Sequence, residues 1–184
     1  MDDNKKRYIG ATAIILAATM WGFDGVVLTP RLYNLDVGFV VFMLHFVPFV
    51  LMNIFLFKEY KKLRSFTKAD FLVLGGIAFF GGALGTLAIV KALFLVHFDH
   101  LSIIVLLQKL QPIFAIILAA IFLKEKIKPR FIFWGILAVI ASYFLTFGFR
   151  KPNMGEDAPL IQAAIWALVA AFSFGSATVL GKKA

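Results

Sequence analysis

Six apolar stretches, each about long enough to cross a lipid bilayer, follow one another along this chain. They cover residues 8–28, 37–57, 71–96, 101–123, 131–149 and 160–181. A helix needs about 20 apolar residues to span a hydrocarbon core roughly 30 Å thick. Because lipid offers no partner to backbone N–H and C=O groups, each stretch has to be helical. The sequence therefore predicts an all-α membrane protein with six transmembrane helices.

The composition excludes several classes of protein. Charged residues make up 16% of the chain and hydrophobic residues 61%. In a soluble domain, about 25% of the residues are charged and about half are apolar. The absence of cysteine excludes disulfides, thiolate metal sites and cysteine nucleophiles. The sequence contains no HExxH, GxSxG or Walker motif. We therefore expect a protein that is not an enzyme and that uses no cofactor.

The positive charges fall mainly on one side of the predicted membrane. Fourteen of the 19 Lys and Arg residues lie at the N-terminus, in alternate connections or directly after the last span, three lie on the opposite side, and Lys91 and Lys109 lie within spans. Such a bias places the N-terminus in the cytoplasm. The net charge of +9 then reflects topology in the cytoplasmic membrane. We expect the lipid bilayer as a partner and no nucleic acid.

Lys109 is a charged residue inside the apolar stretch 101–123. A charge at such a position costs about 2.5–3.5 kcal/mol on insertion scales, so it usually faces a cavity, a partner charge or a substrate. Gln108 and Gln111 lie beside it, and Pro112 cannot donate a backbone hydrogen bond to the carbonyl of Gln108. This combination predicts a kinked helix with a substrate-binding centre. The alternatives are a structural charge and amides that bond across helices.

Two other spans carry further candidate binding residues. At about 1.5 Å per residue, His45 and Lys109 lie roughly 12–13 Å below the outer boundary, and Asp24 lies roughly 6–8 Å below it. We expect Asp24, His45 and Trp21 to complete the site. Asp24 either pairs with Lys109 or helps to bracket a zwitterionic solute, and Asp24 or His45 could couple transport to protons. The alternatives are hydration of Asp24 and packing of His45, while Pro48 bends the second span.

Other polar and small residues suit structural roles. Gly81 and Gly85 form a GxxxG pair that predicts close helix packing. Lys91 is expected to extend to the interface, and Glu125 to pair with lysines near it in sequence. The loop His97–His100 contains metal-ligand types but lacks a further partner and a scaffold, so we expect no metal site.

The sixth stretch resembles the start of the first. Residues 17–22 align with residues 170–175, and Val26 then aligns with Val179. Because five spans separate the two starts, the two copies would cross the membrane in opposite directions. Inverted repeats of this kind are common in carriers of small solutes.

Several short motifs resemble those of the drug/metabolite transporter superfamily with an EamA-type repeat. The motifs are Trp21-Gly22, Lys91–Leu93, Leu110–Ala115, Leu123–Ile127 and Trp134-Gly135. The resemblance implies a five-helix repeat over residues 8–150 and the first helix of a second, truncated repeat over residues 160–184. Members of the family usually have ten helices, so we expect a piece of a longer carrier. If the chain were complete, we would expect a homodimer.

The resemblance implies a secondary transporter, or permease. It would move a small polar metabolite, such as an amino acid or related compound, across the cytoplasmic membrane by alternating access. One alternative is a multidrug exporter, for which Asp24 is the candidate carboxylate. The other is a membrane protein with no transport activity, either an assembly factor or an enzyme.

Overall fold

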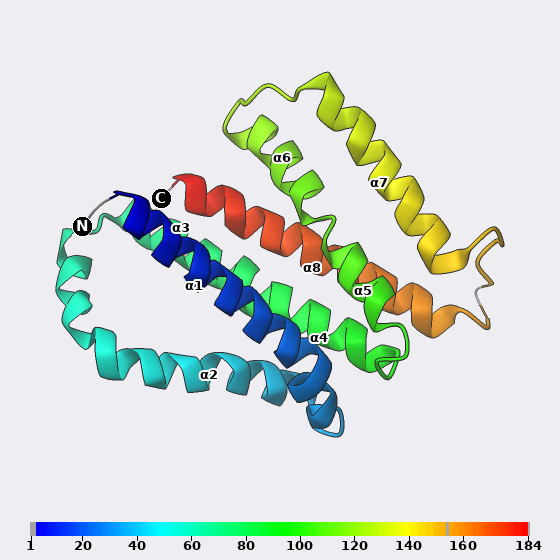
Figure 1. Ribbon diagram of the computed structural model, residues 1–184, viewed down its shortest axis with the longest axis horizontal. Coiled ribbons are helices and arrows are strands. Elements are labelled where there is room, and N and C mark those ends of the chain that lie inside the picture. The colour runs from blue at the N-terminus through cyan, green and yellow to red at the C-terminus, as the bar shows by residue number, and fades with distance from the viewer. Residues whose placement is uncertain (1–2, 154, 184) are drawn as a thin grey trace. The chain divides into compact units, whose positions relative to one another are not determined.

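The computed structural model describes residues 3–153 and 155–183 (Figure 1), and every regular element in these residues is a helix. Six helical segments are long and apolar enough to cross a membrane, and each overlaps one of the predicted stretches. The predicted all-α membrane fold is therefore confirmed. The chain divides into two compact units, Met1–Asp36 and Val37–Ala184.

The first unit is one helical segment that changes its geometry near its end. The helix α1, Asp3–Phe23, leads into the π-helix η1, Asp24–Leu28, and the 3₁₀-helix η2, Thr29–Leu32. At the end of η1, the N–H of Thr29 donates to the carbonyl of Asp24, five residues earlier. Pro30 has no N–H to extend an α-helical ladder, which accounts for the end of regular α-structure here.

The second unit begins with two of the predicted spans. Helix α2, Val37–Leu56, is followed by the 3₁₀-helix η3, Phe57–Ser65. The next span consists of α3, Lys68–Ile77, the π-helix η4, Ala78–Leu84, and α4, Gly85–Leu95. Thr67 and Asp70 start α3 with a capping box, in which each side chain bonds the other residue's backbone N–H.

The remaining spans are one interrupted and two continuous helices. Helices α5, Leu101–Gln108, and α6, Gln111–Phe122, share the fourth span, followed by α7, Pro129–Phe147, and α8, Ala158–Lys183. Pro129 is the first residue of α7, where the missing N–H of proline has no helical partner to lose.

Helix α8 forms the centre of the second unit. It packs against α3, η4, α4, α5 and α6, and Figure 1 shows it running between α4 and the α5–α6 pair. The buried apolar cluster comes from these helices and consists of Ala92, Leu93, Val96, Ile104, Leu107, Leu160, Ala163 and Ala167. By contrast, α7 carries many exposed large apolar side chains, as expected of a helix that faces lipid.

Small residues allow α8 to approach its neighbours closely. A Cβ on Gly81 would lie 3.0 Å from the Cβ of Ala177, and one on Gly85 would lie 2.8 Å from Cε1 of Phe174. On another side of α8, a Cβ on Gly175 would lie 3.0 Å from the backbone nitrogen of Ala115. The predicted close packing at Gly81 and Gly85 is confirmed, and the partner is α8.

Candidate functional site

The fourth span is interrupted at the position of its charged residue. Helix α5 ends at Gln108, and α6 begins at Gln111. Lys109 and Leu110 between them both have φ −71°, with ψ near 0°. The N–H of Leu110 donates to Leu107, and that of Ile113 donates to Leu110, each across three residues. The chain therefore makes a short, tight turn in the middle of the span.

This interruption corrects the expectation of a single kinked helix. Pro112 lies in the first turn of α6, where its missing N–H costs little. For the same reason it cannot donate to the carbonyl of Gln108, the residue at which α5 ends. The result is two half-helices, with Lys109 at the junction. In carriers, junctions of this kind place backbone groups where a solute can bind.

The two glutamines at the junction have different surroundings. Gln108 is 2% exposed and therefore faces the interior of the unit. The Nε2 atom of Gln111 donates to Oγ1 of Thr178 on α8 at 3.1 Å, and that hydroxyl donates to the carbonyl of Phe174. Gln111 thus bonds across helices, as one of the alternatives expected. The side chain of Lys109 is exposed.

His45 lies in a separate groove between α2 and η4. Its Nδ1 atom lies 2.9 Å from the carbonyl oxygen of Val41, one turn earlier in α2. A Cβ on Gly82 of η4 would lie 3.5 Å from Nε2, so the other ring nitrogen faces η4. The open groove, of about 700 Å³, is lined by residues of α2 and η4. The junction residues are not among the described residues that line it.

Pro48 also lines this groove, but it does not interrupt its helix. Helix α2 continues through Pro48 to Leu56. Opposite it lies a π-helix, a form in which the backbone widens and which is often found at functional sites. The groove therefore combines a proline inside a helix with a widened helical segment, and these lie in the second and third candidate membrane spans.

Asp24 and Trp21 belong to the first unit. The Oδ2 atom of Asp24 accepts a hydrogen bond from Oγ1 of Thr29 at 3.3 Å, and Asp24 is the first residue of η1. The side chain of Trp21 is largely exposed near the end of α1. The predicted proximity of these two residues to Lys109 stays a prediction.

One buried polar group was not predicted. The hydroxyl of Ser173 on α8 is fully buried and has no hydrogen-bond partner among the described residues. Its neighbours in sequence are phenylalanines, so a local pattern gives no reason to expect it at the centre of the unit. Only the central position of α8 accounts for its burial.

Two cationic side chains contact partners far away in sequence. The Nζ atom of Lys91 lies 4.3 Å from the ring centroid of Trp166, a cation–π contact between α4 and α8. Glu125, which follows α6, pairs with Lys182 at the end of α8 rather than with a nearby lysine. Lys91 is half-buried, and its expected extension to the interface stays a prediction. Both contacts tie α8 to the preceding helices, and neither could be found from local sequence.

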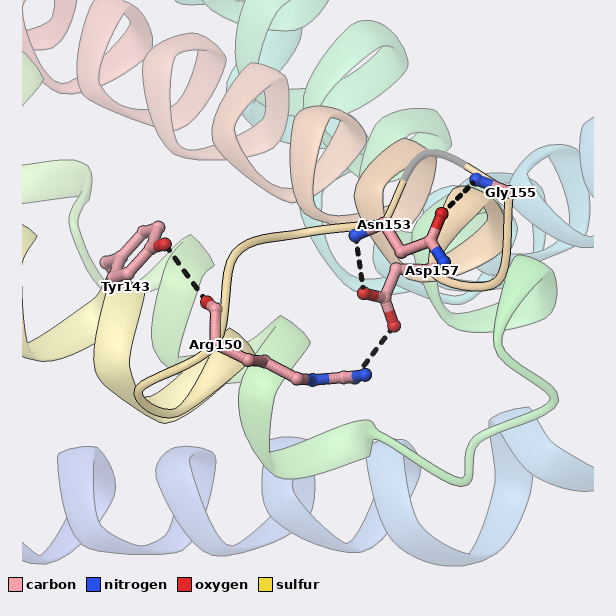
Figure 2. Close-up of polar contacts among 5 residues, drawn as sticks. All are labelled: Tyr143, Arg150, Asn153, Gly155 and Asp157. Carbon is pink, nitrogen blue, oxygen red and sulfur yellow. Dashed lines mark hydrogen bonds and ion pairs between the residues drawn. The ribbon is translucent and has the colours of Figure 1, made fainter.

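The connection between α7 and α8 is held by its own polar contacts (Figure 2). The buried carboxylate of Asp157 accepts hydrogen bonds from Nη2 of Arg150 at 2.8 Å and from the N–H of Asn153 at 3.0 Å. Oδ1 of Asn153 accepts from the N–H of Gly155, and Tyr143 donates to the carbonyl of Arg150. Because Asp157 immediately precedes α8, its charge also suits the helix N-terminus.

The loop His97–His100 supplies no metal centre among the residues that the structure describes. No group of three or more His, Asp or Glu side chains that could hold an ion occurs there. His97 and Phe98 have positive φ angles of 50° and 65°, which mark a tight turn.

Comparison with known proteins identifies the family. The model of the EamA-like transporter family matches residues 8–147, which is more than half of the chain. This chain belongs to the EamA-like transporter family. With its six candidate spans, it is a multi-pass membrane protein, and the family points to a transporter rather than an enzyme. The family resemblance drawn from the sequence motifs is confirmed.

A curated relative extends this comparison to the whole chain. The chain is 55% identical over 184 residues to the riboflavin transporter ImpX of Fusobacterium nucleatum. The match covers all of this chain and 60% of the relative, so the chain spans about three fifths of the relative's length. No solved structure matches the chain.

Proposed function

We propose that the protein is a secondary transporter that moves riboflavin or a closely related small metabolite across the cytoplasmic membrane. The observation that carries this proposal is the 55% identity, along the entire chain, to a riboflavin transporter. An amino acid, the example expected from the sequence, becomes the comparison solute. The proposal keeps the expected division into a five-helix repeat, residues 8–150, and the first helix of a second repeat.

The interrupted fourth span supports a polar solute. Riboflavin is uncharged and carries ring carbonyls and a chain of hydroxyl groups. A lysine ammonium and glutamine amides can donate hydrogen bonds to such oxygens. Lys109 is exposed at a helix junction beside buried Gln108. We assign Lys109 to binding the polar part of the substrate during alternating access.

Orientation and coupling belong to the same proposal. The distribution of Lys and Arg supports a cytoplasmic N-terminus. Asp24 and His45 remain the candidate groups for proton coupling. A homodimer stays a prediction that oligomeric-state measurements on the complete gene product can test.

The test is uptake of labelled riboflavin by cells that cannot make it, with the complete gene product expressed. Lys109→Gln removes the charge and should lower uptake at least about tenfold, the value of one charge-assisted hydrogen bond. Lys91→Gln is the matched control, because Lys91 is also a lysine within a span but contacts Trp166 instead. It should keep the KM for riboflavin.

The outcomes separate the two parts of the proposal. If the unaltered protein transports the labelled amino acid but not riboflavin, the proposed substrate is wrong. If riboflavin enters equally well with Lys109→Gln, riboflavin transport stands and the assignment of Lys109 is wrong.

A further inference from the structure

The groove between α2 and η4 is almost entirely apolar. The open groove has a volume of about 700 Å³, which lies within the usual range of about 300–1,000 Å³ for small-molecule sites. Of the described residues that line it, His45 is the one with a polar side chain, among aromatic, aliphatic and small neighbours. An apolar lining with a placed polar group is typical of small-molecule sites, in which the polar group orients the ligand.

The hydrogen bond of His45 determines what its free nitrogen can do. A backbone carbonyl only accepts, so at 2.9 Å from Val41 the Nδ1 atom must carry the proton. In the neutral ring, Nε2 is then an acceptor. No hydrogen bond to Nε2 occurs among the residues that the structure describes. Gly82 has no side chain beside Nε2, where an added Cβ would lie 3.5 Å from this nitrogen.

Aromatic rings flank His45 on the same helix. The rings of Phe42 and Phe46 are stacked, with centroids 5.1 Å apart and planes 16° from parallel. Both rings line the groove, and both are exposed. Such rings favour offset stacking or edge contacts with another flat aromatic ring.

We infer that this groove binds the planar ring system of the transported flavin, with Nε2 of His45 accepting a hydrogen bond from the ring's imide N–H. The inference rests on the proposed function. An acyl chain of a lipid, or an apolar helix laid into the groove, would leave Nε2 without a donor in apolar surroundings, which is unfavourable. A heteroaromatic ring with an N–H at its edge satisfies both the apolar walls and the acceptor.

The experiment compares two flavins that differ at one atom. Riboflavin and its N3-methyl derivative bind to the purified complete transporter, and quenching of flavin fluorescence measures each Kd. The unaltered protein should bind riboflavin about 3–10-fold more tightly, the effect of one neutral hydrogen bond. His45→Leu should bring the two affinities to within about twofold of each other, because the acceptor is gone.

Three variants serve as controls for this ratio. His45→Gln can place an amide oxygen near the position of Nε2 and should restore part of the discrimination. Phe42→Leu should weaken both flavins but keep their ratio, since it changes only the apolar wall. His100→Leu, in the exposed loop after α4, should leave both affinities unchanged.

The ratio also distinguishes this inference from the proposed function. If riboflavin binds and His45→Leu discriminates as strongly as the unaltered protein, the groove is not the flavin site, although riboflavin transport stands. If His45→Leu does not fold, either of two other results would overturn the inference. One is equal binding of the two flavins by the unaltered protein. The other is full discrimination by the double variant His45→Gln/Gly82→Leu, in which a residue that lines the groove is also replaced. If riboflavin does not bind at all, the proposed function itself is wrong.

Discussion

The π-helix η4 has two sides that are built from adjacent glycines but serve different purposes. Towards α8, Gly81 leaves only 3.0 Å between an added Cβ and Ala177, and Gly85, directly after η4, leaves 2.8 Å to Phe174. Towards α2, Gly82 leaves 3.5 Å to His45 and borders a groove of about 700 Å³. Gly81 and Gly85 thus allow tight packing against α8, whereas Gly82 borders the groove that faces α2.

The largest expected effect tests the tight side. Gly85→Ala should lower the free energy of unfolding by about 1–3 kcal/mol, because the new methyl group meets both Phe174 and the backbone carbonyl of Phe80. Gly75→Ala in α3 is the matched control, since nothing lies within 4 Å of its added Cβ. Thermal unfolding in detergent measures both. Equal melting temperatures of the two variants would contradict a close approach of Phe174 and Phe80 at Gly85.

The hydrogen bond between Gln111 of α6 and Thr178 of α8 should contribute less to stability than the close packing at Gly85. Gln111→Leu and Thr178→Val, made singly and together, should give a coupling energy of about 0.6 kcal/mol, and at most about 1.7 kcal/mol. A double-mutant cycle on unfolding in detergent measures this coupling. Strictly additive effects would mean that glycine packing, and not this hydrogen bond, accounts for the position of α8.

A substitution on the side of η4 that faces the groove should raise the free energy of unfolding, whereas Gly85→Ala should lower it. Gly82→Ala places its methyl group in ordinary contact with His45, and alanine in a helix is more stable than glycine by roughly 0.5–1 kcal/mol. We therefore expect a small gain in unfolding free energy, measured in the same way. A loss as large as that of Gly85→Ala would contradict an open groove.

The smallest effect is expected where α8 ends. Glu125→Gln breaks the ion pair between Glu125 and Lys182, and the side chains of both residues are exposed. Such pairs contribute roughly 0–1 kcal/mol and weaken in salt. The melting temperature of Glu125→Gln should differ little from that of the unaltered protein at low salt and should converge with it at high salt.

Two prolines show how far local sequence reasoning reaches. Both Pro48 and Pro112 were predicted to bend their helices. Helix α2 continues through Pro48, whereas the fourth span breaks before Pro112 into α5 and α6. Each proline removes one hydrogen bond. Whether the helix continues depends on how neighbouring helices satisfy the released groups, which the residues on either side of a proline do not reveal.

The candidate site shows a similar division. Counting residues predicted that His45 and Lys109 share a depth in the membrane. The structure places His45 in the groove beside η4 and Lys109 at the junction of α5 and α6. Depth follows from the helical rise, but the direction in which a side chain points depends on the rotation of each packed helix.

The sequence by itself determined the six membrane spans, because lipid forces apolar segments to satisfy their own backbone groups. Its short motifs also indicated the family and the glycine pair that packs closely. Only the tertiary structure decided that α8 is the partner of that glycine pair, that Lys91 lies over Trp166 and that Glu125 pairs with Lys182. The two cationic side chains meet partners on helices far away in sequence. Their contacts depend on how closely the helices approach and how each helix is rotated, and these follow from side-chain packing between helices rather than from any local pattern.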